Sequence, residues 1–367
     1  MAQCLSCGST SPEIPAVLGL CLRCIREGTG TAADVAADVH ARARRYYGLR
    51  EAIPEDDEGV RCGVCRNRCL IGEGMAGYCG LRENRGGRIV ELGGTPERGF
   101  LDWYYDPMPT NCVADWVCAG GSSAGYPTYS RSRGPEYGCV NLAVFYRACT
   151  FDCLFCQNWH FREGVGGGRS TSAHELAGKA SPQTSCICFF GGDPTPQMLH
   201  SLAVAEEALE AAGDRPLRIC WETNGSMSRV LMAKAAEVAL RSGGTIKIDL
   251  KTWDPNLSRA LCGVGNEQTL ENFAFVASKM GERPDPPLLV ASTLLVPGYV
   301  DEQEISSIAR FIASCNQDIP YALLAFHPAF VMDDLPTTSR RQAQAAEAAA
   351  RAAGLSRVRI GNIHLLT

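Results

Sequence analysis

The chain lacks long apolar runs and an excess of basic residues. No stretch approaches the ~18 consecutive apolar residues of a membrane span. The N-terminus, MAQCLSCGST, has neither the basic nor the apolar region of a signal peptide. The net charge of -5 gives no reason to expect nucleic acid or an anionic membrane as a partner. We therefore expect a cytoplasmic protein that binds neither.

Cysteine, by contrast, is abundant. The 367 residues are 46% hydrophobic and 20% charged, which suits one barrel-sized domain plus smaller modules, yet they include 19 cysteines. Disulfides are disfavoured in a large cytoplasmic chain, where clustered cysteines more often bind metal. Fourteen of the 19 lie before residue 160, mostly at two- or three-residue spacings. The composition therefore predicts several metal sites in the first part of the chain.

Three regions follow from the pattern along the chain. Residues 1–53 hold two cysteine pairs and an Ala-rich segment that predicts a helix over 31–53. Residues 54–138 open with the linker PEDDEG, are rich in cysteine and glycine, and are expected to be irregular from 101 onward. Residues 139–367 alternate short apolar runs with helical patterns, and we expect them to form one domain.

That alternation predicts an α/β fold with a parallel sheet, curled into an open or partial barrel. In such a sheet the loops after the strands share one face, where barrel active sites are built. The strands are expected at 140–147, 185–190, 217–222, 245–250, 288–295, 321–326 and 357–361. The helices are expected at 172–180, 197–212, 228–242, 267–280, 302–315 and 338–353.

A loop with three cysteines follows the first of these strands. Cys149, Cys153 and Cys156 are spaced to wrap one corner of a [4Fe–4S] cube, whose full ligation would need four thiolates. The missing ligand leaves one iron open to a small molecule. The alternatives are a zinc knuckle that lacks its last ligand, or a loop of buried cysteines.

The Cys-x3-Cys-x2-Cys loop, with the aromatic Phe155 before its last cysteine, resembles the signature of radical S-adenosylmethionine (SAM) enzymes. The stretch CTFDCLFCQNW is similar to the branch containing pyruvate formate-lyase activating enzymes. The resemblance implies a partial (β/α)6 barrel, a [4Fe–4S] cluster and bound SAM. It also implies that an electron from the cluster cleaves SAM and that the resulting 5′-deoxyadenosyl radical abstracts a hydrogen atom from the substrate.

Further motifs fall at the ends of later strands. FFGGDPTP resembles the family's GGE motif, with Asp193 in place of the usual Glu, and the WETNG segment is expected to hold the ribose or carboxylate of SAM. Asp249 and Lys251 end the IDLK segment. We expect them either to belong to the site or to form a surface salt bridge. His327 in FHPAF is expected to contact SAM or substrate, or to be structural. The SAM-binding residues implied are Phe155, Gly191, Gly192, Asp193, Glu222, Thr223, Asn224, Asp249, Lys251 and His327.

The segments CGVCRNRC, GYCGLRENRGG, CQNW and VRIGNIH look like the activating-enzyme-like group called AmmeMemoRadiSam. This group label describes sequence kinship and does not settle a substrate.

Two sets of four cysteines precede the barrel. The first, with zinc-ribbon spacing, predicts a structural Zn²⁺ site or a rubredoxin-like iron: Cys4, Cys7, Cys21 and Cys24. The second predicts zinc, an auxiliary Fe–S cluster or unligated thiols: Cys62, Cys65, Cys69 and Cys79. A looser third group covers a cofactor, completes an auxiliary cluster or is buried: Cys112, Cys118 and Cys139. Three cysteines in strand-like runs are read as small core residues: Cys186, Cys188 and Cys220.

The family resemblance favours a protein substrate and a low-potential electron donor such as ferredoxin or flavodoxin. The sharpest expectation is cobalamin-dependent C-methylation of a glutamine in methyl-coenzyme M reductase, although the chain has no Asp-x-His-x-x-Gly cobalamin motif. The aromatic residues that would line a cobalamin pocket, or else the core, are Trp103, Tyr104, Tyr105 and Trp116. Activation of a glycyl-radical enzyme and radical chemistry on a small molecule remain alternatives. A non-enzymatic metal scaffold would not cleave SAM.

Overall fold

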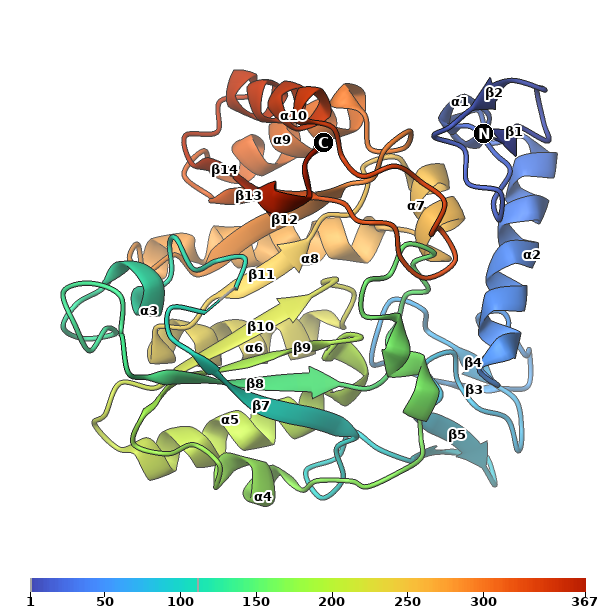
Figure 1. The fold of residues 1–367 in the computed structure, drawn as a ribbon. Coiled ribbons are helices and arrows are strands. Elements are labelled where there is room, and N and C mark those ends of the chain that lie inside the picture. The colour runs from blue at the N-terminus through green and yellow to red at the C-terminus, as the bar shows by residue number, and fades with distance from the viewer. Residues whose placement is uncertain (1, 111) are drawn as a thin grey trace.

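The computed structural model describes residues 2–110 and 112–367, and its centre is one eight-stranded sheet (Figure 1). The strands lie side by side in chain order from β7 to β14, and β8 to β14 are parallel. Their bounds are β7 Leu101–Pro107, β8 Val140–Tyr146, β9 Thr184–Gly191, β10 Arg218–Thr223, β11 Ile246–Asp249, β12 Leu289–Leu295, β13 Tyr321–Ala325 and β14 Val358–Gly361.

Helices connect the seven parallel strands and cover the outer face of the sheet. The connecting helices are α4 Ala173–Ala177, α5 Met198–Ala212, α6 Arg229–Ser242, α7 Pro255–Cys262, α8 Glu267–Ser278, α9 Glu302–Cys315 and α10 Arg340–Ala352. Because the strands are covered, they read as nearly continuous apolar runs, and β9 is buried over its first six residues. The predicted partial (β/α)6 barrel is confirmed as six β/α units that lead to the final strand β14.

Two elements of this sheet and its helices were not expected. β7 pairs antiparallel with β8 along its whole length, so the expectation of irregular structure from residue 101 was wrong there. Its sequence, LDWYYDP, is half exposed and carries two acidic residues, and only the pairing with β8 makes it a strand. The short helix α7 follows β11, with Asp254 as its N-cap and Pro255 in its first turn.

The N-terminal extension runs beside the barrel. It contains α1 Leu22–Arg26, α2 Gly30–Tyr46 and three small hairpins: β1 Ala2–Gln3 with β2 Thr10–Ser11, β3 Val60–Arg61 with β4 Leu70–Ile71, and β5 Arg82–Arg85 with β6 Arg88–Glu91. A last short helix, α3 Ala119–Ser122, lies in the connection from β7 to β8. The helix α2 stands against α7 (Figure 1) and ends at Tyr46, earlier than the predicted residue 53.

Long-range polar contacts seat this extension on the C-terminal half of the barrel. The Tyr299 hydroxyl donates a hydrogen bond of 2.7 Å to the Leu20 carbonyl oxygen. Arg26 pairs with Asp301 at 2.7 Å and with Glu304 at 3.1 Å. Within the described residues, no helix is both long enough and apolar enough to cross a membrane.

Candidate active site

A cavity of about 260 Å³ opens at the carboxyl ends of the parallel strands. Barrel and open-sheet enzymes build their active sites at this edge. The structure brings together here the three cysteines of the loop after β8 and most of the predicted SAM-binding residues. Those lining the cavity are Cys149, Cys153, Cys156, Phe155, Gly191, Gly192, Asp193, Glu222, Thr223, Asn224, Asp249 and Lys251.

The cysteine loop turns sharply away from β8. Ala148, directly before it, has a positive φ of 95°, which a non-glycine residue rarely adopts. The three thiols of the loop all line the cavity. Burial raises the pKa of the Cys149 and Cys156 thiols, and the nearby cations Arg162 and Lys251 oppose this shift at Cys156. The loop therefore places its sulfurs in a dry site with positive charge beside them.

Asp152 anchors the loop from behind. Its carboxylate is fully buried and pairs with Arg162 at 2.9 Å, His40 at 2.9 Å and Arg44 at 3.6 Å. Burial alone would raise the pKa of Asp152, but His40 and the two guanidinium groups lower it to about 2. Two of these partners lie on α2, so the N-terminal extension directly holds the cysteine loop.

The glycines after β9 are required by close backbone approach. A Cβ atom on Gly191 would lie 2.5 Å from both the backbone nitrogen and the carbonyl oxygen of Tyr146, and one on Gly192 would lie 2.4 Å from the Ala148 oxygen. The Gly192 and Asp193 amides also bond to Tyr146 and Ala148 at 2.9 and 3.0 Å. The Gly-Gly turn thus locks the end of β9 against the start of the cysteine loop.

Asp193 ties the ends of β9 and β10 together. It accepts hydrogen bonds from the Asn224 amide at 2.6 Å, from the Thr195 amide at 2.8 Å and from the Thr223 hydroxyl. Asn224 in turn donates to the Thr150 hydroxyl at 2.9 Å. These side chains are engaged within the protein, so they support the site and orient the loop that carries Cys149.

A row of alternating charges crosses the floor of the cavity. Lys247 lies 2.7 Å from Glu222 and 3.3 Å from Asp249, and Lys251 lies 3.3 Å from Asp249. The Ser292 hydroxyl also donates to Asp249. Burial disfavours charge on Lys247, Asp249 and Lys251, but the Asp249 carboxylate raises the pKa of both lysines, and the lysines hold the pKa of Asp249 below its usual range. These three groups are therefore ionised at neutral pH.

Other residues at the cavity had not been singled out from the sequence. Lys247 was missed because it sits inside the apolar strand IKID, although its two-residue spacing from Asp249 places both on one face. Arg162 and Asn362 also line the cavity. His327, in contrast, is exposed, bonds to the Pro328 oxygen at 2.8 Å and lies outside the lining.

The fully buried Cys262 is a further neighbour of the loop. It contacts Cys153, and the hydrogen bond between the two thiols lowers the pKa of Cys153. No sequence pattern predicts this contact, because the two residues are more than one hundred positions apart.

The donor set fits the groups that the sequence resemblance implies. Three thiols on one loop suit a [4Fe–4S] cluster with one open iron, whereas a closed metal site would present four ligands. The charged row beside them offers carboxylates and ammonium groups to a ligand that carries both an amino and a carboxylate group, as SAM does.

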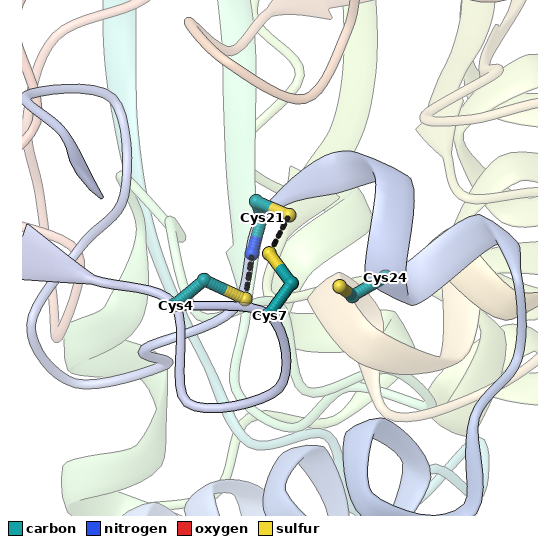
Figure 2. A group of neighbouring side chains, drawn as sticks. All are labelled: Cys4, Cys7, Cys21 and Cys24. Atoms are coloured by element: carbon teal, nitrogen blue, oxygen red, sulfur yellow. Dashed lines mark hydrogen bonds between the residues drawn. The ribbon is translucent and has the colours of Figure 1, made fainter. Parts of the chain in front are cut away.

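A second cysteine cluster lies in the N-terminal module (Figure 2). The donor atoms of Cys4, Cys7, Cys21 and Cys24 all lie within 4.8 Å of one another. The Cys7 and Cys21 sulfurs are 3.7 Å apart, and the Cys21 amide donates to the Cys4 sulfur at 3.4 Å. This spacing suits one tetrahedral metal ion with four thiolate ligands.

The second predicted set of four is more open. Cys62 and Cys69 are buried, and the Cys62 amide bonds to the Cys69 carbonyl oxygen at 2.9 Å. Burial raises the pKa of the Cys69 thiol to about 11. Cys79 is half-buried and lies 3.9 Å from an Arg82 nitrogen. Among the described residues, only the N-terminal set brings three or more metal-ligand atoms within 4.8 Å of one another.

Comparison with known families decides the nature of the domain. Residues 143–312, which contain the cysteine loop and the strands β9 to β12, match the family model of the Radical SAM superfamily. These residues form a radical SAM domain. A radical SAM domain implies a [4Fe–4S] cluster and SAM as its cofactors.

Two relatives match the chain over different shares of its length. An uncharacterised protein of Methanocaldococcus jannaschii is 25% identical over 327 residues, which are 86% of each chain. The isethionate sulfite-lyase activating enzyme of Oleidesulfovibrio alaskensis is 32% identical over 143 residues, 38% of this chain and 41% of that enzyme. The chain thus matches less than half of the length of this second relative.

Among solved structures, a domain of a pyruvate-formate lyase-activating enzyme from Bacteroides vulgatus is similar. It is 23% identical, with a TM-score of 0.38, and the match covers 48% of this chain and 98% of that domain.

Proposed function

We propose that this radical SAM enzyme cleaves SAM reductively and uses the 5′-deoxyadenosyl radical to abstract a hydrogen atom from a protein substrate. The observation that carries the proposal is the loop of three cysteines beside a buried, ionised cavity of about 260 Å³. In this proposal Cys149, Cys153 and Cys156 hold the cluster. When bound, the cluster supplies the electron that breaks a carbon–sulfur bond of SAM.

The chain's own groups orient SAM in this scheme. Lys251 and Lys247 face the SAM carboxylate, while Asp249 and Glu222 accept hydrogen bonds from its amino group or ribose. These groups already pair with one another, so they are held in place before the ligand arrives. Phe155 and the Gly191–Gly192 turn complete the wall and keep water away from the reacting atoms. We assign His327 no part in this mechanism.

The finer proposal is C-methylation of a glutamine in methyl-coenzyme M reductase. Methyl transfer to such a carbon needs a methyl donor, for which we propose cobalamin. Trp103 and Tyr105 pack edge to face on β7, with their ring centres 5.5 Å apart, and Tyr104 is half exposed beside them. None of these three residues lines the SAM cavity, so a cobalamin bound there would lie outside it.

Glycyl-radical activation is the second candidate. The likeness to the isethionate sulfite-lyase activating enzyme favours it, because that relative is named for activating a partner enzyme. In this case the hydrogen atom would come from a glycine of the partner, and no methyl donor would be needed.

The domain boundaries 1–53, 54–138 and 139–367 are part of the proposal. In it the first module holds structural Zn²⁺, or iron in the same four-thiolate shell, and Cys62, Cys65, Cys69 and Cys79 hold zinc or an auxiliary Fe–S cluster. A ferredoxin or flavodoxin supplies the electron.

The experiment is anaerobic incubation of the reconstituted full chain with SAM and dithionite, with 5′-deoxyadenosine measured by chromatography and mass spectrometry. We expect its formation to require Cys149. Background levels in the reconstituted wild-type protein would overturn the proposal.

Cobalt analysis and a substrate assay then separate the two finer candidates. Bound cobalamin and a substrate peptide heavier by one methyl group would support methylation. A glycyl-radical EPR signal in a partner enzyme, without cobalt, would support activation.

A further inference from the structure

Five cysteines from separate parts of the chain meet inside the barrel, on the amino-terminal side of the SAM cavity. They line one buried cavity: Cys112, Cys118, Cys186, Cys188 and Cys220. We call this set the interior cage. The sequence had suggested that the last three were small core residues and that the first two belonged to a looser group with Cys139, which does not line this cavity.

The sheet register creates the cage. Cys186 and Cys188 are two residues apart on β9, so their side chains point to the same face of the sheet. Cys220 on β10 is the register partner of Cys188. The connection from β7 to β8 then brings Cys112 and Cys118 over these strands, with Cys118 at the start of α3.

Two cage sulfurs accept hydrogen bonds from backbone amides. The Ala114 amide donates to the Cys112 sulfur and the Thr245 amide to the Cys220 sulfur, both at 3.4 Å. Such hydrogen bonds to sulfur help to set the properties of iron–sulfur centres. The Cys112 and Cys186 thiols donate to Glu222 and Asn141 at 3.3 and 3.1 Å, and binding of iron would replace these two bonds. Arg218 and Lys247 also line the cavity, each paired with a carboxylate.

The cage is too wide for a single ion. Two sulfurs bound to one zinc ion at about 2.3 Å each lie no more than about 4.6 Å apart. The cage does not bring three ligand atoms within 4.8 Å of one another, since among the described residues only the N-terminal group does so. Thiols spaced more widely suit a cluster in which several iron atoms share the ligands.

The free space limits the size of that cluster. The cavity measures about 30 Å³, which exceeds the ~10–15 Å³ that one water needs. In a [2Fe–2S] cluster the irons lie between the cysteine sulfurs, so mainly the two bridging sulfides need free space. A four-iron cube would need more.

We propose that the interior cage binds a [2Fe–2S] cluster through four of its five thiolates. Glu222 and Lys247 line both this cavity and the SAM cavity, so their ion pair forms the partition between the two. The assignment is independent of the proposed function, because it rests on ligands that the cysteine loop does not use.

The test counts iron and acid-labile sulfide in the anaerobically purified full chain. Cys188→Ser combined with Cys220→Ser should lose two irons and two sulfides per chain relative to wild type. This double variant should keep the EPR signal of the reduced radical SAM cluster, which shows that the barrel is folded. Cys315→Ser, at the end of α9 and outside every cysteine cluster described here, is the control and should lose nothing.

Unchanged iron and sulfide in a folded double variant would overturn the proposal, as would zinc without sulfide at this site. If the double variant does not fold, a second variant, in which the interior cage is intact, tests the proposal instead. A variant with Cys62→Ser, Cys65→Ser and Cys149→Ala should still contain two acid-labile sulfides, at least two irons and a [2Fe–2S] EPR signal after reduction. Absence of that signal would equally overturn the assignment, while the SAM-cleavage assay on wild type tests the proposed function separately.

Discussion

The N-terminal cysteine group and the cysteine loop after β8 are both built from cysteine thiols, but their surroundings suit different roles. In the N-terminal group, four donor atoms lie within 4.8 Å of one another, so an ion there would have its tetrahedral shell filled by protein. The loop instead presents three thiols to a cavity that also carries an ionised row. The number of thiols and their access to a cavity, more than the density of cysteines, separate a structural site from a reactive one.

The two sites are also held differently. The loop is anchored by a fully buried carboxylate, Asp152, which contacts two guanidinium groups and the His40 ring. The N-terminal module is seated by Arg26, whose contacts to Asp301 and Glu304 are partly exposed. Damage to the loop or its anchor should therefore cost more than damage to the module.

The largest effect is expected at the loop itself. Cys149→Ala removes one of the three proposed cluster ligands, so the cluster should be absent or unstable and SAM cleavage should fall to background. The measurement is 5′-deoxyadenosine formed after anaerobic reduction, with Cys315→Ala as the control. Cleavage at the wild-type rate in the Cys149 variant would remove the distinction between the two sites.

The next effect is on stability. Asp152→Asn leaves the buried Arg162 and Arg44 without their carboxylate, and loss of one partner of a buried pair typically costs about 3–5 kcal/mol. Denaturant unfolding measures this loss. Asp38→Asn, on the exposed face of the same helix that carries His40, should cost less than about 1 kcal/mol. Equal losses of unfolding free energy in the two variants would show that Asp152 stabilises the fold no more than an exposed carboxylate does.

Acid should weaken the same anchor. The folded-state pKa of Asp152 is about 2, below the unfolded value of about 3.9, so its contribution is complete above pH ~4. It is lost as the pH falls from about 4 to about 2, and amounts to roughly 2 kcal/mol. The buried Glu136, paired with Arg218, has the same depressed pKa of about 2 and adds to this slope.

Calorimetric Tm values between about pH 6 and about pH 2 measure this dependence. The dependence should be shallower in Asp152→Asn and unchanged in Asp38→Asn. A wild-type slope in Asp152→Asn would contradict the depressed pKa.

The smallest effect on catalysis is expected from the N-terminal group. Cys4→Ser should lower bound metal by about one ion per chain and speed amide exchange in residues 2–26, because a closed thiolate site stabilises a module with little core of its own. SAM cleavage should stay within about twofold of wild type. Loss of cleavage while the barrel stays folded would show that the two sites are coupled.

Much of the barrel was predictable because its strands are buried. The strand ends expected from the apolar runs differ from the observed ends by no more than one residue between β8 and β14. The strand β7 was not predictable, because its alternating acidic and aromatic residues form a strand only when paired with β8.

Prediction of the site residues from the sequence met the same limit. Cys149, Cys153 and Cys156 were found from spacing within one short loop. Lys247 and the pairing of Cys188 with Cys220 depend on which residues of neighbouring strands lie opposite each other, and a single sequence does not give that register.

The contacts of α2 and the N-terminal module constrain the order of events during synthesis. His40 meets its partner Asp152 112 residues later, and Arg26 meets Asp301 275 residues later. Arg26 and α2 therefore wait for much of the chain that follows them before they can dock. Until then the cysteine loop lacks the helix whose His40 and Arg44 contact Asp152.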